Sequence, residues 1–255
     1  MLLALAVVAV WGTNFVVIKH ALVHLPPLTF AALRFSLVVF PALLFFKRPR
    51  VPWANLAAYG LLIGAGQFGL LFLAMKGHIS PGLASLVVQM QVFFTIGLSM
   101  RFTGERIQAY QLAALGMAAI GLLVILLRAD GDATPLGVGL VLLAGLSWAG
   151  GNTVSRAAGS VNTVAYVVWS SLFAVPPLLI LAFVFEGWPA MAAGIRNADA
   201  GSWVAVVWQS VGNSLFGYGA WAWLLSKHPA ATVAPLALTI PVFGMGASAL
   251  LLGEP

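Results

Sequence analysis

The feature that most constrains the fold of this sequence is a succession of long apolar runs, separated by charged residues, prolines and glycines. Of the 255 residues, 62% are hydrophobic and only 7% are charged, whereas a soluble domain carries about 25% charged residues. Lipid can solvate that much apolar surface and water cannot. Because the runs are continuous rather than alternating, a β-barrel is disfavoured. We therefore expect an all-α, polytopic helical membrane protein.

The breaks between these runs divide the chain into nine expected transmembrane helices. Interior prolines, at Pro41, Pro176–Pro177, Pro235 and Pro241, are expected to kink the helices rather than end them. The first run has no charged segment before it and no small-residue cleavage site after it, so it is expected to be a helix rather than a signal peptide. The expected spans are 2–19, 27–46, 53–75, 81–101, 107–127, 136–157, 161–185, 202–226 and 230–252.

Lysine and arginine are distributed unequally between the two sides of the expected bundle, and short cytoplasmic loops are the richer ones. We therefore expect the amino terminus to be cytoplasmic. The net charge of +6 arises mostly from residues at helix ends, so no nucleic-acid partner is expected. The richer side has Lys47, Arg48, Arg50, Arg101, Arg106, Arg156 and Lys227, and the other has Lys19, Lys76, Arg128 and Arg196.

The two halves of the chain resemble each other. W-G-T-N-F-V-V-I-K at 11–19 parallels W-A-G-G-N-T-V-S-R at 148–156, and 75–105 aligns without gaps with 224–254. Because five helices is an odd number, the second copy would enter from the opposite face, as in the inverted repeats of secondary transporters. We expect a first repeat at 1–128 and a second at 136–255. The tenth helix of this ten-helix plan would follow Gly253-Glu254 and is absent from this chain.

Seven short stretches, spread over nearly the whole chain, stand out beside the repeat. They are 11–19, L-P-P-L-T-F-A-A-L-R-F (25–35), G-L-A-S-L-V-V-Q-M-Q-V-F-F-T (82–95), T-G-E-R (103–106), S-W-A-G-G-N (147–152), G-Y-G-A-W (217–221) and V-A-P-L-A-L-T-I-P-V-F-G (233–244). In these stretches the chain resembles the EamA family of the drug/metabolite transporter superfamily. The resemblance implies a bacterial inner-membrane exporter of amino acids or related metabolites, such as cysteine, O-acetylserine or aromatic amino acids, and not an enzyme. It also implies a central cavity, with the helix that closes each repeat at the periphery.

Three polar residues inside the spans are the first candidates for substrate binding. Arg34 is the most deeply placed charge, and two parallel hydrogen bonds from it would hold a carboxylate. Its alternative is a structural arginine bonded to helix-end carbonyls. Asn14 and Asn152 occupy corresponding places in the two halves, where they either face a common cavity or join helices by amide hydrogen bonds.

Uncharged amides provide further candidates, because they bind both ends of a zwitterion without burying a charge. Gln67 and Asn213 lie within the third and eighth spans. Gln89 and Gln91 are two residues apart, about 200° around an α-helix, so at most one of them is expected to line a pore. Gln89 is the favoured one.

Deep aromatic residues are the remaining binding candidates. Trp148, Trp169 and Tyr218 lie far enough from the span ends for their rings to stack on an apolar side chain or to face an ammonium group. The alternative is that they anchor helices at the bilayer interface.

Prolines in the fourth and ninth spans, 81–101 and 230–252, are expected to act as hinges for alternating access. They are Pro81, Pro235 and Pro241. Bending of these two helices would gate the central cavity.

The scarcity of charge within the spans bears on the substrate. No Asp or Glu lies within any expected span, which disfavours an organic cation and proton coupling through a membrane carboxylate. Only Arg34 is available for the phosphate of a sugar phosphate or nucleotide sugar. A neutral or zwitterionic solute fits both absences, and the other substrate classes in the same fold remain the alternative.

Two apparent motifs do not indicate a cofactor or a metal. Residues 64–69 match G-x-G-x-x-G but lack a preceding strand, so Gly60 and Gly64 are expected instead to let two helices pack closely. His20 and His24 have a spacing that fits a metal, yet they precede a Pro-Pro pair at a membrane edge. We expect no cofactor, no metal and no catalytic residue. A monomer is compatible with the sequence.

Overall fold

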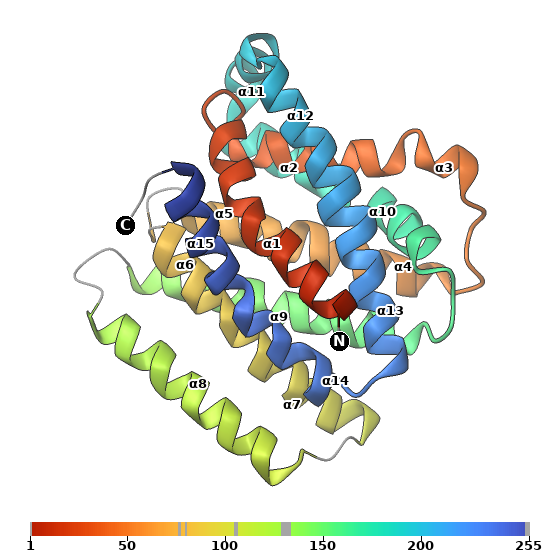
Figure 1. Cartoon of the computed structure of the whole chain (residues 1–255). Helices are drawn as coiled ribbons and strands as arrows, with labels where there is room; N and C mark the ends of the chain where they lie inside the picture. Colours follow the sequence, from red (N-terminus) through yellow and green to blue (C-terminus); the bar gives the residue numbers. More distant parts are fainter. Residues whose placement is uncertain (1, 76–77, 80, 105–106, 129–133, 253–255) are drawn as a thin grey trace.

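A computed structural model describes residues 2–75, 78–79, 81–104, 107–128 and 134–252. Within these ranges every secondary-structure element of three or more residues is a helix, and the helices pack into one bundle (Figure 1). Four segments are long and apolar enough to cross a membrane by length and composition: Pro27–Phe45, Trp53–Ala74, Pro135–Ala157 and Thr163–Phe185. The expectation of a polytopic helical membrane protein is confirmed.

Each expected span coincides with a helix or with consecutive helical segments. The described elements are α1 (Leu2–Ala21), α2 (Pro27–Val39), α3 (Ala42–Phe45), α4 (Trp53–Gly60), η1 (Leu61–Gly69), α5 (Leu70–Met75), α6 (Pro81–Val87), η2 (Val88–Met90), α7 (Gln91–Thr103), α8 (Ala109–Arg128), α9 (Pro135–Ala157), α10 (Thr163–Phe185), α11 (Gly187–Asn197), α12 (Ala200–Trp208), η3 (Gln209–Tyr218), α13 (Gly219–Lys227), α14 (Ala230–Val233), η4 (Ala234–Thr239) and α15 (Ile240–Leu252).

One local expectation was wrong. Pro41 ends α2 rather than kinking it, because Phe40 before it is extended and α3 starts only at Ala42. The stretch between the seventh and eighth expected spans forms a further helix, α11. Pro176 and Pro177 stay inside a continuous α10, as expected.

The two halves share the same irregularities in the same order. The third spanning segment of each half has a π-helix at its centre, η1 and η3. The fourth segment of each half has a 3₁₀ stretch, η2 and η4. Such departures from α-helical geometry are frequent at functional sites, and non-helical backbone at membrane depth requires surrounding protein. Gly253 and Glu254, after which a tenth helix is expected, lie outside the described residues.

Close packing at glycines holds the bundle together around α10. A side chain at Gly60 would meet the carbonyl of Ser170, and one at Gly64 would meet the Cβ of Ala174. The expected G-x-x-x-G contact is therefore confirmed. By contrast α8 lies at the edge of the bundle (Figure 1), and of its described side chains only Leu115 is buried.

Helix ends are capped by side chains, in one case from the other half of the chain. Glu186, which follows α10, accepts hydrogen bonds from the backbone N–H groups of Leu28 (2.5 Å) and Thr29 (2.9 Å) and from the Thr29 hydroxyl (2.7 Å). A carboxylate is stabilised at a helix N-terminus by the unpaired N–H groups there. Asp199 caps α12 in the same way, and hydrogen bonds from Ser202 lower the pKa of Asp199.

Candidate functional site

A cavity of about 140 Å³ lies in the middle of the bundle. Along α1 its wall runs from Trp11 to Ile18, roughly 10 Å at the rise of an α-helix, towards the carboxyl-terminal end of that helix. Pockets for drug-sized ligands are about 300–1,000 Å³, so this space suits a smaller solute. Its wall is formed by Trp11, Asn14, Ile18, Gln67, Phe68, Leu71, Phe72, Val88, Gln89, Gln91, Trp148, Asn213, Tyr218, Ile240 and Pro241.

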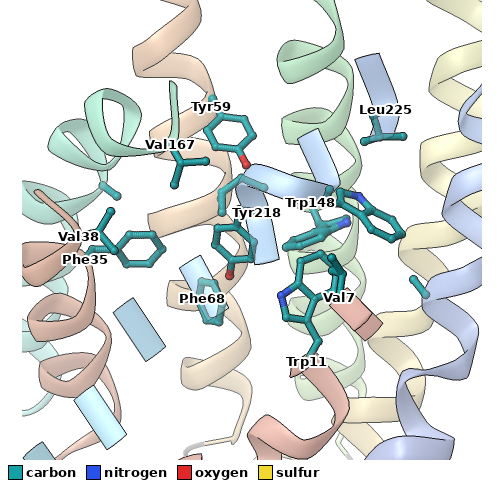
Figure 2. Close-up of a cluster of buried hydrophobic side chains, with 14 of the residues drawn as sticks. Val7, Trp11, Phe35, Val38, Tyr59, Phe68, Trp148, Val167, Tyr218 and Leu225 are labelled. Carbon is teal, nitrogen blue, oxygen red and sulfur yellow. The ribbon is translucent and has the colours of Figure 1, made fainter. Parts of the chain in front are cut away.

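Aromatic rings close the cavity towards the amino-terminal end of α1. Trp11 meets Trp148 edge to face with the ring centroids 5.2 Å apart, and Tyr218 lies 5.7 Å from Trp11 and 5.6 Å from Trp148. Figure 2 shows the three rings converging from different helices. Beyond these rings, nearer the amino terminus of α1, Val7 and Val8 are fully buried. The cavity therefore does not continue past this aromatic cluster.

Five amide side chains are among the residues that line the cavity. Within the described part of the chain, four of their oxygens are buried without a hydrogen-bond partner: Asn14 Oδ1, Gln67 Oε1, Gln91 Oε1 and Asn213 Oδ1. An unpaired buried acceptor costs about 1–3 kcal/mol. None of the described lining residues carries a formal charge. The wall is therefore mostly apolar and uncharged, with unpaired amide oxygens buried just beneath its surface.

The expectation that only one of Gln89 and Gln91 lines the pore was wrong, since both contribute to the wall. Gln89 lies in the 3₁₀ stretch η2, where three residues make a turn, so positions two apart diverge less than in an α-helix. Gln91 Nε2 also donates to Gln89 Oε1 over 3.4 Å, which draws the two side chains together.

Arg34 lies behind the cavity wall and not in it. Its side chain, 1% exposed, donates to Gln209 Oε1 (3.0 Å), Ser214 Oγ (3.2 Å) and Tyr218 OH (2.8 Å). The guanidinium carbon also lies over the Phe68 ring, 4.2 Å from its centroid. The described hydrogen bonds of the Arg34 side chain are thus to side chains of η3, not to the helix-end carbonyls considered from the sequence. Direct contact of Arg34 with substrate stays a prediction.

Asn152 belongs to a second polar region, on the far side of the aromatic cluster. Its Nδ2 donates to Thr95 Oγ1 (3.1 Å), and one turn along the same pair of helices Arg156 donates to Ser99 Oγ (3.0 Å). We call these four residues the α7–α9 ladder. The void beside them is about 10 Å³, roughly the space of one water. Asn14 and Asn152 therefore do not face a common cavity in this conformation.

The remaining candidates are divided between the cavity and the periphery. Trp169 lies away from the cavity: its Nε1 donates to the Phe46 carbonyl (2.9 Å) and its ring packs on Trp53. Pro241 contributes to the cavity wall, and Pro235 lies within η4. Pro81 begins α6, and its side chain lies outside what the structure describes.

Sequence reasoning missed several lining residues, foremost Trp11 and Gln91. Apart from Gln91 the missed residues are apolar or aromatic, and nothing in an apolar run distinguishes a side chain facing a cavity from one facing lipid. Trp11 had two usable signals, its place one turn before Asn14 and its correspondence with Trp148 in the repeat. The others are Ile18, Phe68, Leu71, Phe72, Val88 and Ile240.

Comparison with known proteins agrees with this geometry. The EamA-like transporter family matches residues 1–127 and again 135–255. A probable amino-acid metabolite efflux pump of Salmonella typhimurium is 42% identical over 99% of this chain and 86% of its own length. A protein of the same description from Escherichia coli K12 is 41% identical over the same shares. A solved crystal structure, 19% identical, superposes with a TM-score of 0.74 over 99% of this chain and 88% of its own, which supports the fold alone.

Proposed function

This chain belongs to the EamA-like transporter family, and from that premise we propose that it exports amino acids or closely related metabolites across the bacterial inner membrane. Membership makes the chain a multi-pass membrane transporter of a small molecule rather than an enzyme. Its relatives named as amino-acid metabolite efflux pumps support the substrate class.

The cavity is the observation that carries this proposal. It combines amide oxygens with aromatic and aliphatic walls, and its described lining has no formal charge. A neutral or zwitterionic solute fits such a wall, because its polar ends find hydrogen-bond partners without an unpaired buried charge. The volume and the lack of lining cations disfavour sugar phosphates and nucleotide sugars.

Alternating access between two inverted repeats is the proposed mechanism, with the amino terminus in the cytoplasm and a tenth helix completing the second repeat. On this topology the cavity, which extends from Trp11 towards Ile18, lies in the outward half of the bundle. The matching π and 3₁₀ segments of the two halves support the repeat. The chain works as a monomer in this proposal, since one bundle contains the whole cavity.

The fourth and ninth helical segments are the proposed gates, with Pro81, Pro235 and Pro241 as hinges. Gln89 Nε2 donates to the Ala237 carbonyl over 3.4 Å, so η2 and η4 touch directly. The chain has no cysteine, so the pair Gln89→Cys and Ala237→Cys adds the only thiols. A short thiol crosslinker should abolish flux in the double variant. The singly substituted variants, treated alike, are the controls, and unchanged flux after verified crosslinking would exclude this gating scheme.

Transport itself is tested in proteoliposomes with a panel of labelled amino acids, with and without a pH gradient. We expect flux of at least one amino acid without a gradient, because no carboxylate lines the described cavity wall. Liposomes carrying the Val88→Trp variant, in which the cavity is filled, give the background. The absence of flux for every amino acid tested would sink the amino-acid assignment and leave the fold intact.

A further inference from the structure

Arg34 is the most buried charged side chain in the described part of the chain, yet no carboxylate there pairs with it. We infer that Arg34 is a positioning residue: it sets the direction of the hydrogen bonds in the cavity wall, so that Asn213 accepts from the ammonium group and Tyr218 donates to the carboxylate of a zwitterionic α-amino acid. This inference rests on the proposed function and narrows its substrate class.

The first step is the orientation of Gln209. A guanidinium only donates hydrogen bonds, so the group of Gln209 that lies 3.0 Å from Arg34 must be its carbonyl oxygen. Turning the amide over would place its NH₂ against the guanidinium, donor against donor. Gln209 is completely buried and does not line the cavity, so no solute competes for this bond.

The second step passes this orientation to Asn213. Its Nδ2 lies 2.7 Å from the same Gln209 oxygen. Because that oxygen accepts, Asn213 must donate through Nδ2, and its Oδ1 is left unpaired just beneath the surface of the wall that Asn213 lines. That oxygen has no partner among the residues that the structure describes, and the side chain is 4% exposed. A ligand N–H group would satisfy it, and an ammonium group offers three.

The third step concerns Tyr218, five residues further along η3. The π-helix places residues five apart at successive turns, so Asn213 and Tyr218 lie on the same side of the segment. The Tyr218 oxygen accepts from Arg34 (2.8 Å), which leaves the hydroxyl proton for another acceptor. The positive charge behind this hydroxyl favours an anionic acceptor. One turn of η3 therefore presents an acceptor and a donor at neighbouring positions of the wall.

Gln89 and Gln91, on another part of the wall, form a second chain of oriented amide hydrogen bonds, without a charged residue. The Ala237 carbonyl can only accept, so Gln89 donates to it through Nε2 and accepts from Gln91 through Oε1, both over 3.4 Å. Gln91 Oε1 is then left without a described partner in the wall. This second acceptor lies on another helix and does not depend on Arg34, so it supplies a second contact for the ammonium group.

Three substitutions distinguish the orientation of the hydrogen bonds by Arg34 from the effects of its size and of its charge. Arg34→Met removes the donor, and Gln209→Met breaks the relay while leaving Arg34 in place. Gln209→Glu accepts from both Arg34 and Asn213, so it preserves the direction of the bonds while neutralising the guanidinium. If Arg34 acted through its long-range field alone, Gln209→Glu would behave like Arg34→Met.

The probes are leucine, 4-methylpentanoate, which lacks the ammonium group, and isoamylamine, which lacks the carboxylate. Binding to the purified protein is followed by the fluorescence of Trp11 and Trp148 in the wall. We expect wild type to prefer leucine over each analogue by about 10–100-fold, the range of one hydrogen bond to a charged group. Arg34→Met and Gln209→Met should lose most of this preference, and Gln209→Glu should keep it. Equal preference in all variants would overturn the inference.

A second measurement needs no ligand. Hydrogen exchange of the Asn213 side-chain amide, followed by NMR with labelled asparagine and assigned by its loss in Asn213→Asp, should be slow in wild type and Gln209→Glu. It should be faster in both methionine variants. If wild type binds none of the probes but exchange follows this order, the amino-acid assignment fails and the relay stands. Identical exchange in all variants would refute the relay whatever the substrate is.

Discussion

Asparagine side chains lie in different surroundings in the two polar regions of the bundle, the cavity and the α7–α9 ladder. In the cavity, Asn14 and Asn213 leave their amide oxygens without a partner in the described structure, beside a space of about 140 Å³. In the α7–α9 ladder, Asn152 donates to Thr95 beside a void of about 10 Å³. Polar groups inside a membrane protein either hold helices together or remain available for a solute. The unpaired amide oxygen and the space beside it, rather than the residue type, distinguish the cavity from the ladder.

Filling the cavity should give the largest effect. Val88→Trp places a large ring in the cavity wall, so flux in proteoliposomes should fall to the level of empty liposomes while the protein remains folded. Leu143→Trp, on an exposed face of α9, is the matched control and should transport normally. Normal flux through Val88→Trp would mean that the substrate passes elsewhere.

Removing the cap on α2 should affect stability and not selectivity. Glu186→Ala deletes an acceptor of three hydrogen bonds, two from backbone N–H groups, and should lower the free energy of unfolding by about 2 kcal/mol. Glu186→Gln keeps one acceptor and should be intermediate. Denaturant unfolding in detergent measures the loss. A change in the preference among amino acids, with stability unaltered, would contradict this purely structural role.

Replacing asparagine with leucine at the two corresponding positions, 14 and 152, should change the free energy of unfolding differently in the two regions. Asn152→Leu breaks a paired amide and should destabilise the protein by about 1 kcal/mol. Asn14→Leu removes an unpaired oxygen, so stability should hold or rise, while the apparent affinity for the transported amino acid falls by about tenfold. Unfolding and concentration-dependent flux are measured on both variants. Equal destabilisation by both substitutions would show that Asn14 also holds helices together, as Asn152 does.

The smallest expected effect is a coupling energy. A double-mutant cycle of Thr95→Val and Asn152→Leu should give about 0.6 kcal/mol, the average for interhelical hydrogen bonds in a membrane protein. The corresponding cycle of Asn14→Leu and Gln67→Leu, between which the structure shows no hydrogen bond, should give a coupling near zero. Coupling in the second cycle as large as in the first would show that the cavity amides also hold helices together.

The sequence predicted the spans well because hydropathy reports directly on contact with lipid. It also predicted mid-span amides, and Asn14, Gln67, Gln89 and Asn213 all reach the cavity. The local helix type was not predictable, since π and 3₁₀ stretches depend on packing between helices rather than on local composition. That is why the joint contribution of Gln89 and Gln91 was missed.

The role of individual deep residues depended on contacts between distant segments. Arg34 and Gln209 are 175 positions apart, and no local pattern pairs them. Trp169, like Trp148, lies inside a long apolar run, yet its Nε1 donates to the Phe46 carbonyl, away from the cavity. Pro41 shows the limit for backbone: whether a proline kinks or ends a helix depends on what its neighbours can supply.

The burial of Arg34 has an electrical consequence. A zwitterion carries no net charge, so its passage alone does no work against the membrane voltage. A charge that crosses the membrane gains or loses about 2.3 kcal/mol per 100 mV. Arg34 is the one fully buried charge in the described chain. For the proposed zwitterionic substrate, any movement of α2 that carries this guanidinium along the membrane normal would therefore make transport respond to voltage, and the steepness of that response would measure how far it moves.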